Sequence, residues 1–126
     1  MKYINKKQIL LLHDQIIKKY GGRPGIRDNN LLESAIYAPF QTFGSEELYP
    51  DILSKTARLG YGLIKNHPFI DGNKRIGAHV IFTLLYANGI FANYKDKELI
   101  NIIFSVADGT CDEKQFLYWL YKHTHA

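Results

Sequence analysis

The stretch HPFIDGNKRIGAHVIFTLLYANG, residues 67–89, decides the fold. From Ile76 to Ala87 it is apolar almost all round, which is typical of a helix surrounded by other helices. Pro68 disfavours a helical residue before it, so the preceding helix is predicted to end at this point. We therefore predict a central buried helix from Gly72 or Asn73 to Asn88-Gly89, with its N-terminus at the polar residues of the motif.

Helical periodicity also dominates the rest of the chain, and most of the predicted helices carry a capping residue. The first starts at Asn5, with Gln8 in a weak capping box, and its expected apolar face is Ile9, Leu12, Ile16, Ile17 and Tyr20. The others start at Asp28, at about Asp51, at Asp96, and at Thr110 with Glu113 as a capping box. Residues 39–50 have no clear period and are predicted to form a loop or short hairpin, here called the flap. The prediction is a single all-α domain over residues 1–126, built around the central helix.

Composition narrows the class of protein. With 46% hydrophobic and 22% charged residues, the chain is ordinary globular material. A single cysteine, Cys111, excludes an internal disulfide and a cysteine-rich zinc site and favours a reducing cytosol. The N-terminal residues do not resemble a signal peptide or a membrane span, so we expect a cytoplasmic protein without a membrane partner.

The net charge of +4 and the pI of about 9.1 raise the question of nucleic-acid binding. However, the lysines and arginines are scattered along the chain, with no run longer than two. This distribution argues against nucleic acid as the main partner.

Residues 72–75 carry the features of an anion site. Lys74 and Arg75 are predicted in the first helical turn, where cations are unfavourable to the helix dipole unless an anion is bound there. Gly72 would let a phosphate approach the backbone, the Asn73 amide could donate to it, and Arg75 could clamp it in a bidentate manner. The alternatives are a simple turn at Gly72-Asn73 and two solvated charges. A nucleotide polyphosphate is the anion that we expect.

His67 and Asp71 lie just before this predicted anion site. The ordinary pKa of histidine, near 6.5, suits His67 for accepting a proton from a hydroxyl. Asp71 is a candidate ligand for Mg²⁺, which prefers one or two carboxylates together with substrate phosphates, although an aspartate here could also be only a helix cap. Phe69 is expected to anchor the loop in the core, and His13 to occupy a polar or packing position in a helix, without a catalytic role.

The segment from His67 to Arg75 resembles the signature of the Fic/Doc family, in which a histidine, a phenylalanine, an acidic residue and a Gly-Asn-x-Arg turn open a central helix. Leu12-His13-Asp14 and the stretch from Tyr20 to Asp28 also look like the short death-on-curing (Doc) toxins. The resemblance implies a Fic-like helical bundle with His67 as the base, Asp71 as the metal ligand, and Gly72, Asn73, Lys74 and Arg75 as the phosphate cradle for ATP.

Two positions separate the chemistries of this family. Members that transfer AMP usually have glycine where this chain has Lys74, and many have a second arginine where it has Ala78. The resemblance to Doc therefore implies transfer of the γ-phosphate of ATP to a hydroxyl of a translation factor such as elongation factor Tu. The alternatives are an AMP transferase with the same histidine and aspartate, and a catalytically silent binding module.

Related proteins are restrained by an inhibitory helix with Ser or Thr and, four residues later, Glu followed by Gly or Asn. The nearest match here, Thr42 with Glu46-Glu47, lacks the last residue and lies in the flap. The resemblance therefore implies a separate antitoxin protein as the partner.

Overall fold

The computed structural model describes residues 1–125 and confirms an all-α fold. Within these residues there are six α-helices, joined by short loops and one turn of 3-10 helix (η1, Ala38–Phe40). The α-helices are α1 (Lys6–Tyr20), α2 (Asn29–Tyr37), α3 (Ile52–Asn66), α4 (Asn73–Ala87), α5 (Asp96–Asp108) and α6 (Glu113–Lys122).

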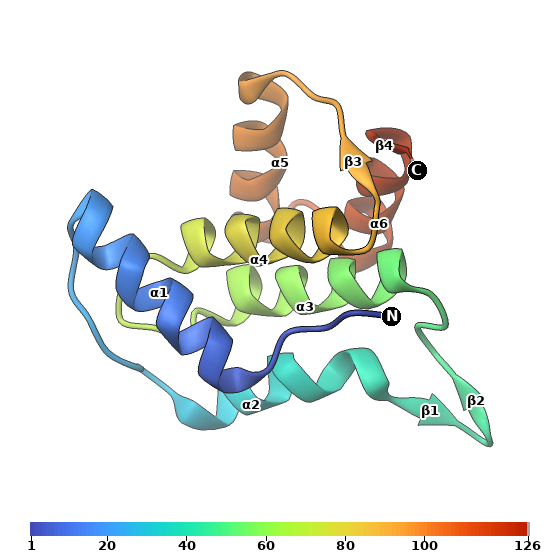
Figure 1. Ribbon diagram of the computed structural model, residues 1–126, viewed down its shortest axis with the longest axis horizontal. Coiled ribbons are helices and arrows are strands. Elements are labelled where there is room, and N and C mark those ends of the chain that lie inside the picture. The colour runs from blue at the N-terminus through green and yellow to red at the C-terminus, as the bar shows by residue number, and fades with distance from the viewer. Residues whose placement is uncertain (126) are drawn as a thin grey trace.

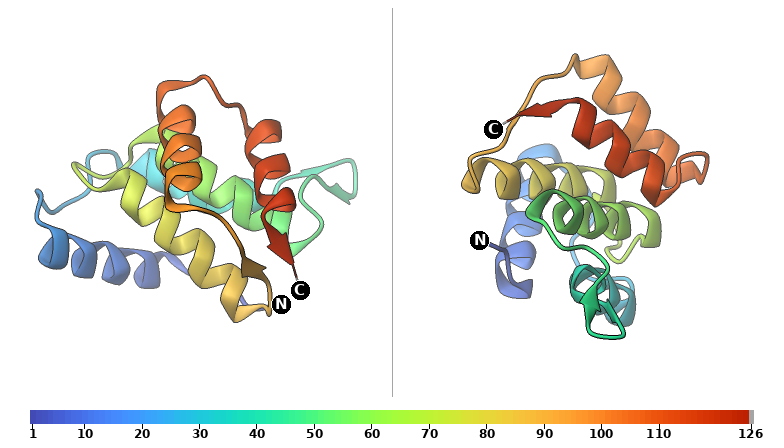
Figure 2. Two further views of the ribbon diagram at one scale, coloured as in Figure 1. Left: turned by 90° about the horizontal axis from the view of Figure 1, so that it is seen from above. Right: turned by 90° about the vertical axis from the view of Figure 1, so that its right-hand side faces the viewer.

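The helices form three layers of two. The central pair is α3 and α4, which lie side by side (Figure 1). Helices α1 and α2 cover one face of this pair, and α5 and α6 cover the other, as the right-hand view of Figure 2 shows. The central helix predicted from the apolar run is thus α4, which is covered on both faces.

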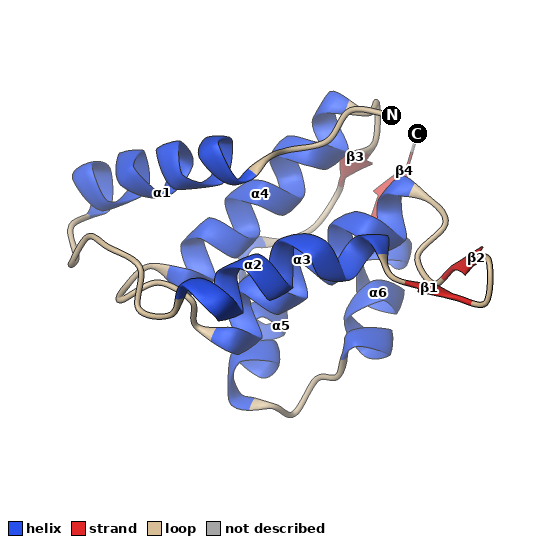
Figure 3. Cartoon of the chain, turned by 90° about the horizontal axis from the view of Figure 1, so that it is seen from below, coloured by secondary structure: helices blue, strands red, loops and turns tan. Residues whose placement is uncertain are grey.

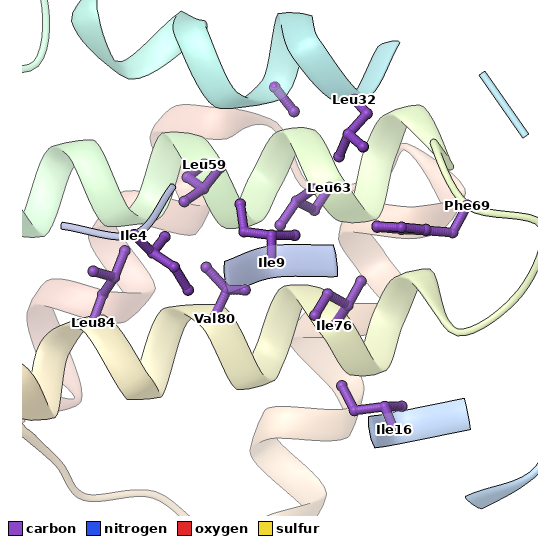
Figure 4. Close-up of a cluster of buried hydrophobic side chains, with 11 residues drawn as sticks. Ile4, Ile9, Ile16, Leu32, Leu59, Leu63, Phe69, Ile76, Val80 and Leu84 are labelled. Carbon is purple, nitrogen blue, oxygen red and sulfur yellow. The ribbon is translucent and has the colours of Figure 1, made fainter. Parts of the chain in front are cut away.

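Side chains on two faces of α4 enter two hydrophobic clusters. Ile76, Val80 and Leu84 pack with residues of α1, α2 and α3 (Figure 4). Ile81 and Leu85 pack with residues of α3, α5 and α6. This double burial explains why the sequence of α4 has no wide polar face.

Two glycines allow α3 and α4 to approach each other closely. A Cβ atom on Gly60 would overlap the Cδ1 atom of Ile81, and one on Gly77 would lie 2.5 Å from the Cγ1 atom of Ile64. A side chain at either position would overlap an isoleucine of the opposite helix, so that either this isoleucine or the spacing of the pair would have to change.

The predicted helix starts are confirmed at Asn5, Asp28 and Asp51, each of which caps its helix. Two predicted caps are wrong. Helix α5 has Lys95 as its N-cap, whose backbone N–H donates to Glu98 Oε1 at 2.9 Å, so that Asp96 is already helical. Helix α6 is capped by Asp112.

The cap of α6 differs from the prediction because two possible capping boxes overlap. Asp112 and Gln115 exchange side-chain and backbone hydrogen bonds at 2.8 and 2.9 Å. The Thr110 hydroxyl donates to Asp108 Oδ1 at 2.6 Å instead of capping the helix. Two candidate pairs only two residues apart could not be distinguished by spacing.

The flap contains a hairpin, as predicted, in which β1 (Thr42–Phe43) pairs with β2 (Glu46–Glu47). It leads into the N-terminal end of α3, at the opposite end of this helix from His67 (Figure 3). A helix of 15 residues is about 22 Å long. The flap therefore does not flank the motif, and the segment with Thr42 and Glu46 forms strands where an inhibitory helix would be needed.

A second strand pair, β3 (Phe91–Ala92) with β4 (Thr124–His125), was not predicted. Each strand is two residues long, which is too short to produce a periodic pattern. In the described part of the chain, no helix has the length and apolarity that a membrane span requires.

Candidate active site

His67 forms the C-terminal cap of α3 in a left-handed conformation, with φ 49° and ψ 56°. Within residues 1–125 it is the one residue other than glycine with a positive φ. Arg27 stabilises this turn, because its guanidinium donates to the His67 carbonyl at 2.6 Å and to the Asn66 carbonyl at 2.9 Å. Strained backbone of this kind persists where neighbouring groups hold it, and it occurs often at functional sites.

The surroundings of the half-buried His67 ring favour its neutral form. Burial lowers the pKa of His67 below its usual value of 6.5, and the positive charges of Lys74, Arg27 and Lys65 lower it further. An imidazole that is neutral at neutral pH has a free lone pair and can accept a proton. The His67 ring is therefore in the protonation state that a general base needs.

Asp71 is exposed, and each of its carboxylate oxygens accepts one backbone N–H. Oδ1 accepts from Gly72 at 2.9 Å, and Oδ2 accepts from Arg23 at 3.2 Å. The N-cap of α4 is Gly72, so the simple interpretation of Asp71 as a helix cap is wrong. A carboxylate has about four lone-pair sites, which leaves sites on both oxygens for another ligand.

The side chain of Asn73, which lines the cavity at the start of α4, also holds the motif loop. It is buried, its Oδ1 accepts from the Phe69 backbone N–H at 2.9 Å, and its Nδ2 donates to the Phe69 carbonyl at 3.0 Å. Both hydrogen bonds close the loop over the buried Phe69 ring, which confirms Phe69 as an anchor. In the described chain no side chain caps the N-terminus of α4, so an anion there would meet backbone N–H groups.

The first turn of α4 opens into a cavity of about 560 Å³. Asp71, Lys74 and Arg75 line it, together with Ala78 and the apolar side of α5. Its volume lies within the range of roughly 300–1,000 Å³ that small-molecule sites occupy. The predicted cradle therefore adjoins a space large enough for a nucleotide.

Aromatic rings hold the two cations of the cradle. The Lys74 ammonium lies 5.0 Å from the centre of the Phe104 ring, and the Arg75 guanidinium lies 4.1 Å from that of Tyr20. Tyr20, which we had placed on the apolar face of α1, is 45% exposed. Arg75 is exposed and Lys74 is half-buried, so both cations remain accessible to an anion.

The loop between α1 and α2 lies over the motif and is hydrogen-bonded to it. Arg27 and Asp28 donate their backbone N–H groups to the Pro68 carbonyl, and Ile70 donates to the Gly25 carbonyl. Gly22 adopts φ +117°, and a Cβ atom there would lie 2.8 Å from Asp71 Oδ2. The close approach of the Asp71 carboxylate thus requires glycine at position 22.

Sequence reasoning missed two residues of this site. Arg27 gave no signal, because its contacts lie 39 and 40 positions away. His13 is buried and its Nε2 atom lies 2.8 Å from the Asp71 carbonyl oxygen. Its place in an apolar stripe with Ile9, Ile16 and Ile17 was the available signal, since a histidine buried there needs a partner.

The site has too few metal-binding side chains to hold a metal ion by itself, but its carboxylate could bind one that is also bound to a nucleotide. Within residues 1–125 no three His, Cys, Asp or Glu side chains gather in a way that could hold a metal ion. Among the residues that line the cavity, Asp71 supplies the carboxylate, and Mg²⁺ is commonly bound by one or two carboxylates with substrate phosphates and water. The arrangement combines a neutral imidazole, one carboxylate and a cationic helix start, which suits transfer of a phosphate-containing group.

Comparisons with known proteins agree with this geometry. The model of the Fic/DOC family matches residues 3–85, which include α1, the loop over the motif and most of α4. Toxin Doc of Mycolicibacterium smegmatis is 33% identical over 95 residues, covering 74% of this chain and 73% of that protein. The protein named protein kinase doc, of Escherichia phage P1, is 29% identical over 109 residues, covering 86% and 85%. The chain therefore belongs to the Fic/DOC family.

Proposed function

We propose that this protein is a Doc-like toxin that transfers the γ-phosphate of ATP to a hydroxyl side chain of another protein. The groove at the start of α4 supports this proposal, because it joins a carboxylate, two cations and backbone N–H groups in one cavity. The likeness to the phage protein kinase doc, along most of both chains, supports the choice of a kinase.

In this proposal each residue of the motif has one task. His67 accepts the proton of the target hydroxyl, whose oxygen forms a bond to the γ-phosphorus while the bond to the bridging oxygen breaks and ADP leaves. The backbone at the start of α4, with Lys74 and Arg75, neutralises the phosphate charge. Asp71 would hold Mg²⁺, which supplies further charge neutralisation of the phosphates.

Two residues that line the groove, Lys74 and Ala78, support γ-phosphate transfer over AMP transfer. Lys74 brings a flexible ammonium to the place where a glycine would leave bare backbone, and Ala78, one turn later on the same wall, has no group for a phosphate. These two residues support a binding mode in which Lys74 positions the phosphates of ATP. In this mode the γ-phosphorus, rather than the α-phosphorus, faces the target hydroxyl.

The proposed partners follow from the resemblance to Doc toxins. The target is a translation factor such as elongation factor Tu, and a separate antitoxin restrains the enzyme. The strand conformation of Thr42–Phe43 and Glu46–Glu47 supports control by another chain, because the nearest match to an inhibitory helix is not helical.

The experiment that tests this function uses ATP labelled on the γ-phosphate in one sample and on the α-phosphate in another. The protein is incubated with Mg²⁺ and either purified elongation factor Tu or a cytosolic extract. We expect label on a protein from γ-labelled ATP only, and His67→Ala should lower that rate by about two to four orders of magnitude. Labelling from α-labelled ATP alone would replace the kinase with an AMP transferase, and near-normal transfer by folded His67→Ala would reject His67 as the base.

A Lys74→Gly variant tests the residue that separates the two chemistries. We expect this variant to label the target more slowly from γ-labelled ATP, because the phosphates lose one cation. Unchanged transfer would show that Lys74 does not determine the position of the phosphates.

A further inference from the structure

The His13 ring is inserted between α1 and the motif loop. The residue is 4% exposed, and its ring is stacked on that of Phe69, with the centroids 3.8 Å apart and an angle of 10° between the planes. Nε2 lies 2.8 Å from the Asp71 carbonyl oxygen. Because a carbonyl can only accept, the ring must donate this hydrogen bond through an Nε2–H group.

The hydrogen bond from His13 holds the peptide group that joins Asp71 to Gly72. The carbonyl of this peptide accepts from His13, and its N–H donates to the Asp71 carboxylate at 2.9 Å. Both edges of the peptide plane are therefore held. If the plane rotated, the Gly72 N–H would leave Oδ1, and the Asp71 carboxylate would lose one of its two backbone donors.

We propose that His13 is a positioning residue, which holds the Asp71-Gly72 peptide so that the Asp71 carboxylate and the start of α4 face the same ligand. This proposal rests on the proposed function in one respect, namely that the ligand is a nucleotide with Mg²⁺. The stack on Phe69 fixes the plane of the ring, and the hydrogen bond transmits that orientation to the loop. Groups that orient a metal ligand in this way commonly change metal affinity or activity by about 10- to 100-fold when removed.

Two substitutions separate the hydrogen bond from the packing. His13→Phe keeps an aromatic ring against Phe69 but removes the donor, whereas His13→Gln can place an N–H near the position of Nε2. Ile9→Val is the matched control, because Ile9 is fully buried on the same helix and packs in the core, without a polar group that could bond to the motif loop. Thermal unfolding of each variant establishes that the proteins compared are folded.

The first readout is the amide resonance of Gly72 in the protein without ligand. We expect a clear shift of this resonance in His13→Phe and one close to the wild type in His13→Gln and Ile9→Val. The second readout is calorimetry with ATP and Mg²⁺. We expect the affinity of His13→Phe to fall by about 10- to 100-fold, and that of His13→Gln to lie within several-fold of the wild type.

Each outcome has a defined consequence. Wild-type affinity for ATP and Mg²⁺ in a folded His13→Phe protein would overturn the positioning role and leave the proposed function intact. Absence of magnesium-dependent ATP binding in the wild type would overturn the proposed function and this proposal's assignment of the ligand. If His13→Phe does not fold, nitrogen NMR of wild-type His13 decides, because an unprotonated Nε2 would exclude the hydrogen bond and overturn the proposal.

Discussion

Burial and three nearby cations lower the pKa of the His67 imidazole. Burial and the nearby Lys74, Arg27 and Lys65 disfavour the imidazolium, so the pKa of His67 lies below 6.5. We expect an NMR titration of the free protein to give a midpoint below 6.5 for this ring. Lys74→Met removes one positive charge, which makes protonation easier, so the midpoint should rise in that variant.

The Lys7→Met variant is the control for this titration, because Lys7 is exposed on α1, away from the motif. The midpoint of His67 should not move in this control. A wild-type midpoint above 6.5, or a fall in Lys74→Met, would contradict the electrostatic explanation.

Asp71 provides a second prediction about a single side chain. In Asp71→Asn, the affinity for ATP with Mg²⁺ should fall by at least about 10-fold, or roughly 1.4 kcal/mol, because the amide cannot replace the charge that binds the metal. Without Mg²⁺, ATP should bind this variant at least as well as the wild type, since a repulsion between the carboxylate and the phosphates is lost. Calorimetry under both conditions measures the difference. An equal loss with and without Mg²⁺ would indicate a structural role only.

The pairing of α3 with α4 depends on the absence of side chains at two positions. In Gly77→Ala, the new Cβ atom would meet Ile64 at 2.5 Å, so we expect the free energy of unfolding to fall by about 1–3 kcal/mol. Urea unfolding measures this loss. Adding Ile64→Ala removes the atoms that clash, and the double variant should lose less stability than the sum of the two single variants. Simple additivity would show that the clash is relieved in another way.

The molecule as a whole places the His67 motif and the anchor of its flap at opposite ends of α3. Lys55 is 2% exposed, and its ammonium donates to Glu47 Oε1 at 2.8 Å, to the Pro39 carbonyl at 3.3 Å and to the Tyr49 carbonyl. Lys55→Met removes the donor from all three acceptors, of which the Pro39 carbonyl belongs to a buried residue, and this should lower the free energy of unfolding by roughly 1–3 kcal/mol. At temperatures where the variant is folded, its affinity for ATP and Mg²⁺ should equal that of the wild type.

This last prediction is checked by urea unfolding together with calorimetry on the same samples. A substantial loss of ATP affinity in folded Lys55→Met would mean that the flap and the motif are coupled through α3. The expected result is a loss of stability alone.

Helix ends, caps and the hairpin depend on residues that are close together in the sequence, and most of them could be predicted from it. The ends of α3 and α4 follow from Pro68 and from the apolar run after Ile76, and the cap at Asn5 follows from a pair three residues apart. The hairpin before α3 was indicated in the same way. Where two local signals overlapped, as at Thr110 and Asp112, spacing alone selected the wrong cap.

The sequence by itself thus determined the helices and the identity of the residues at the motif, while only the tertiary structure decided which groups hold that motif in place. His13 is hydrogen-bonded to Asp71, 58 positions away, and Arg27 to His67, 40 positions away. The periodicity of a helix contains no information about such long-range contacts. Even Asn73, four residues from Phe69, could not be assigned, because its amide fits a phosphate as well as a backbone. A buried polar group takes whichever partner the packing of distant segments brings to it, and that choice is made only when the whole chain has folded.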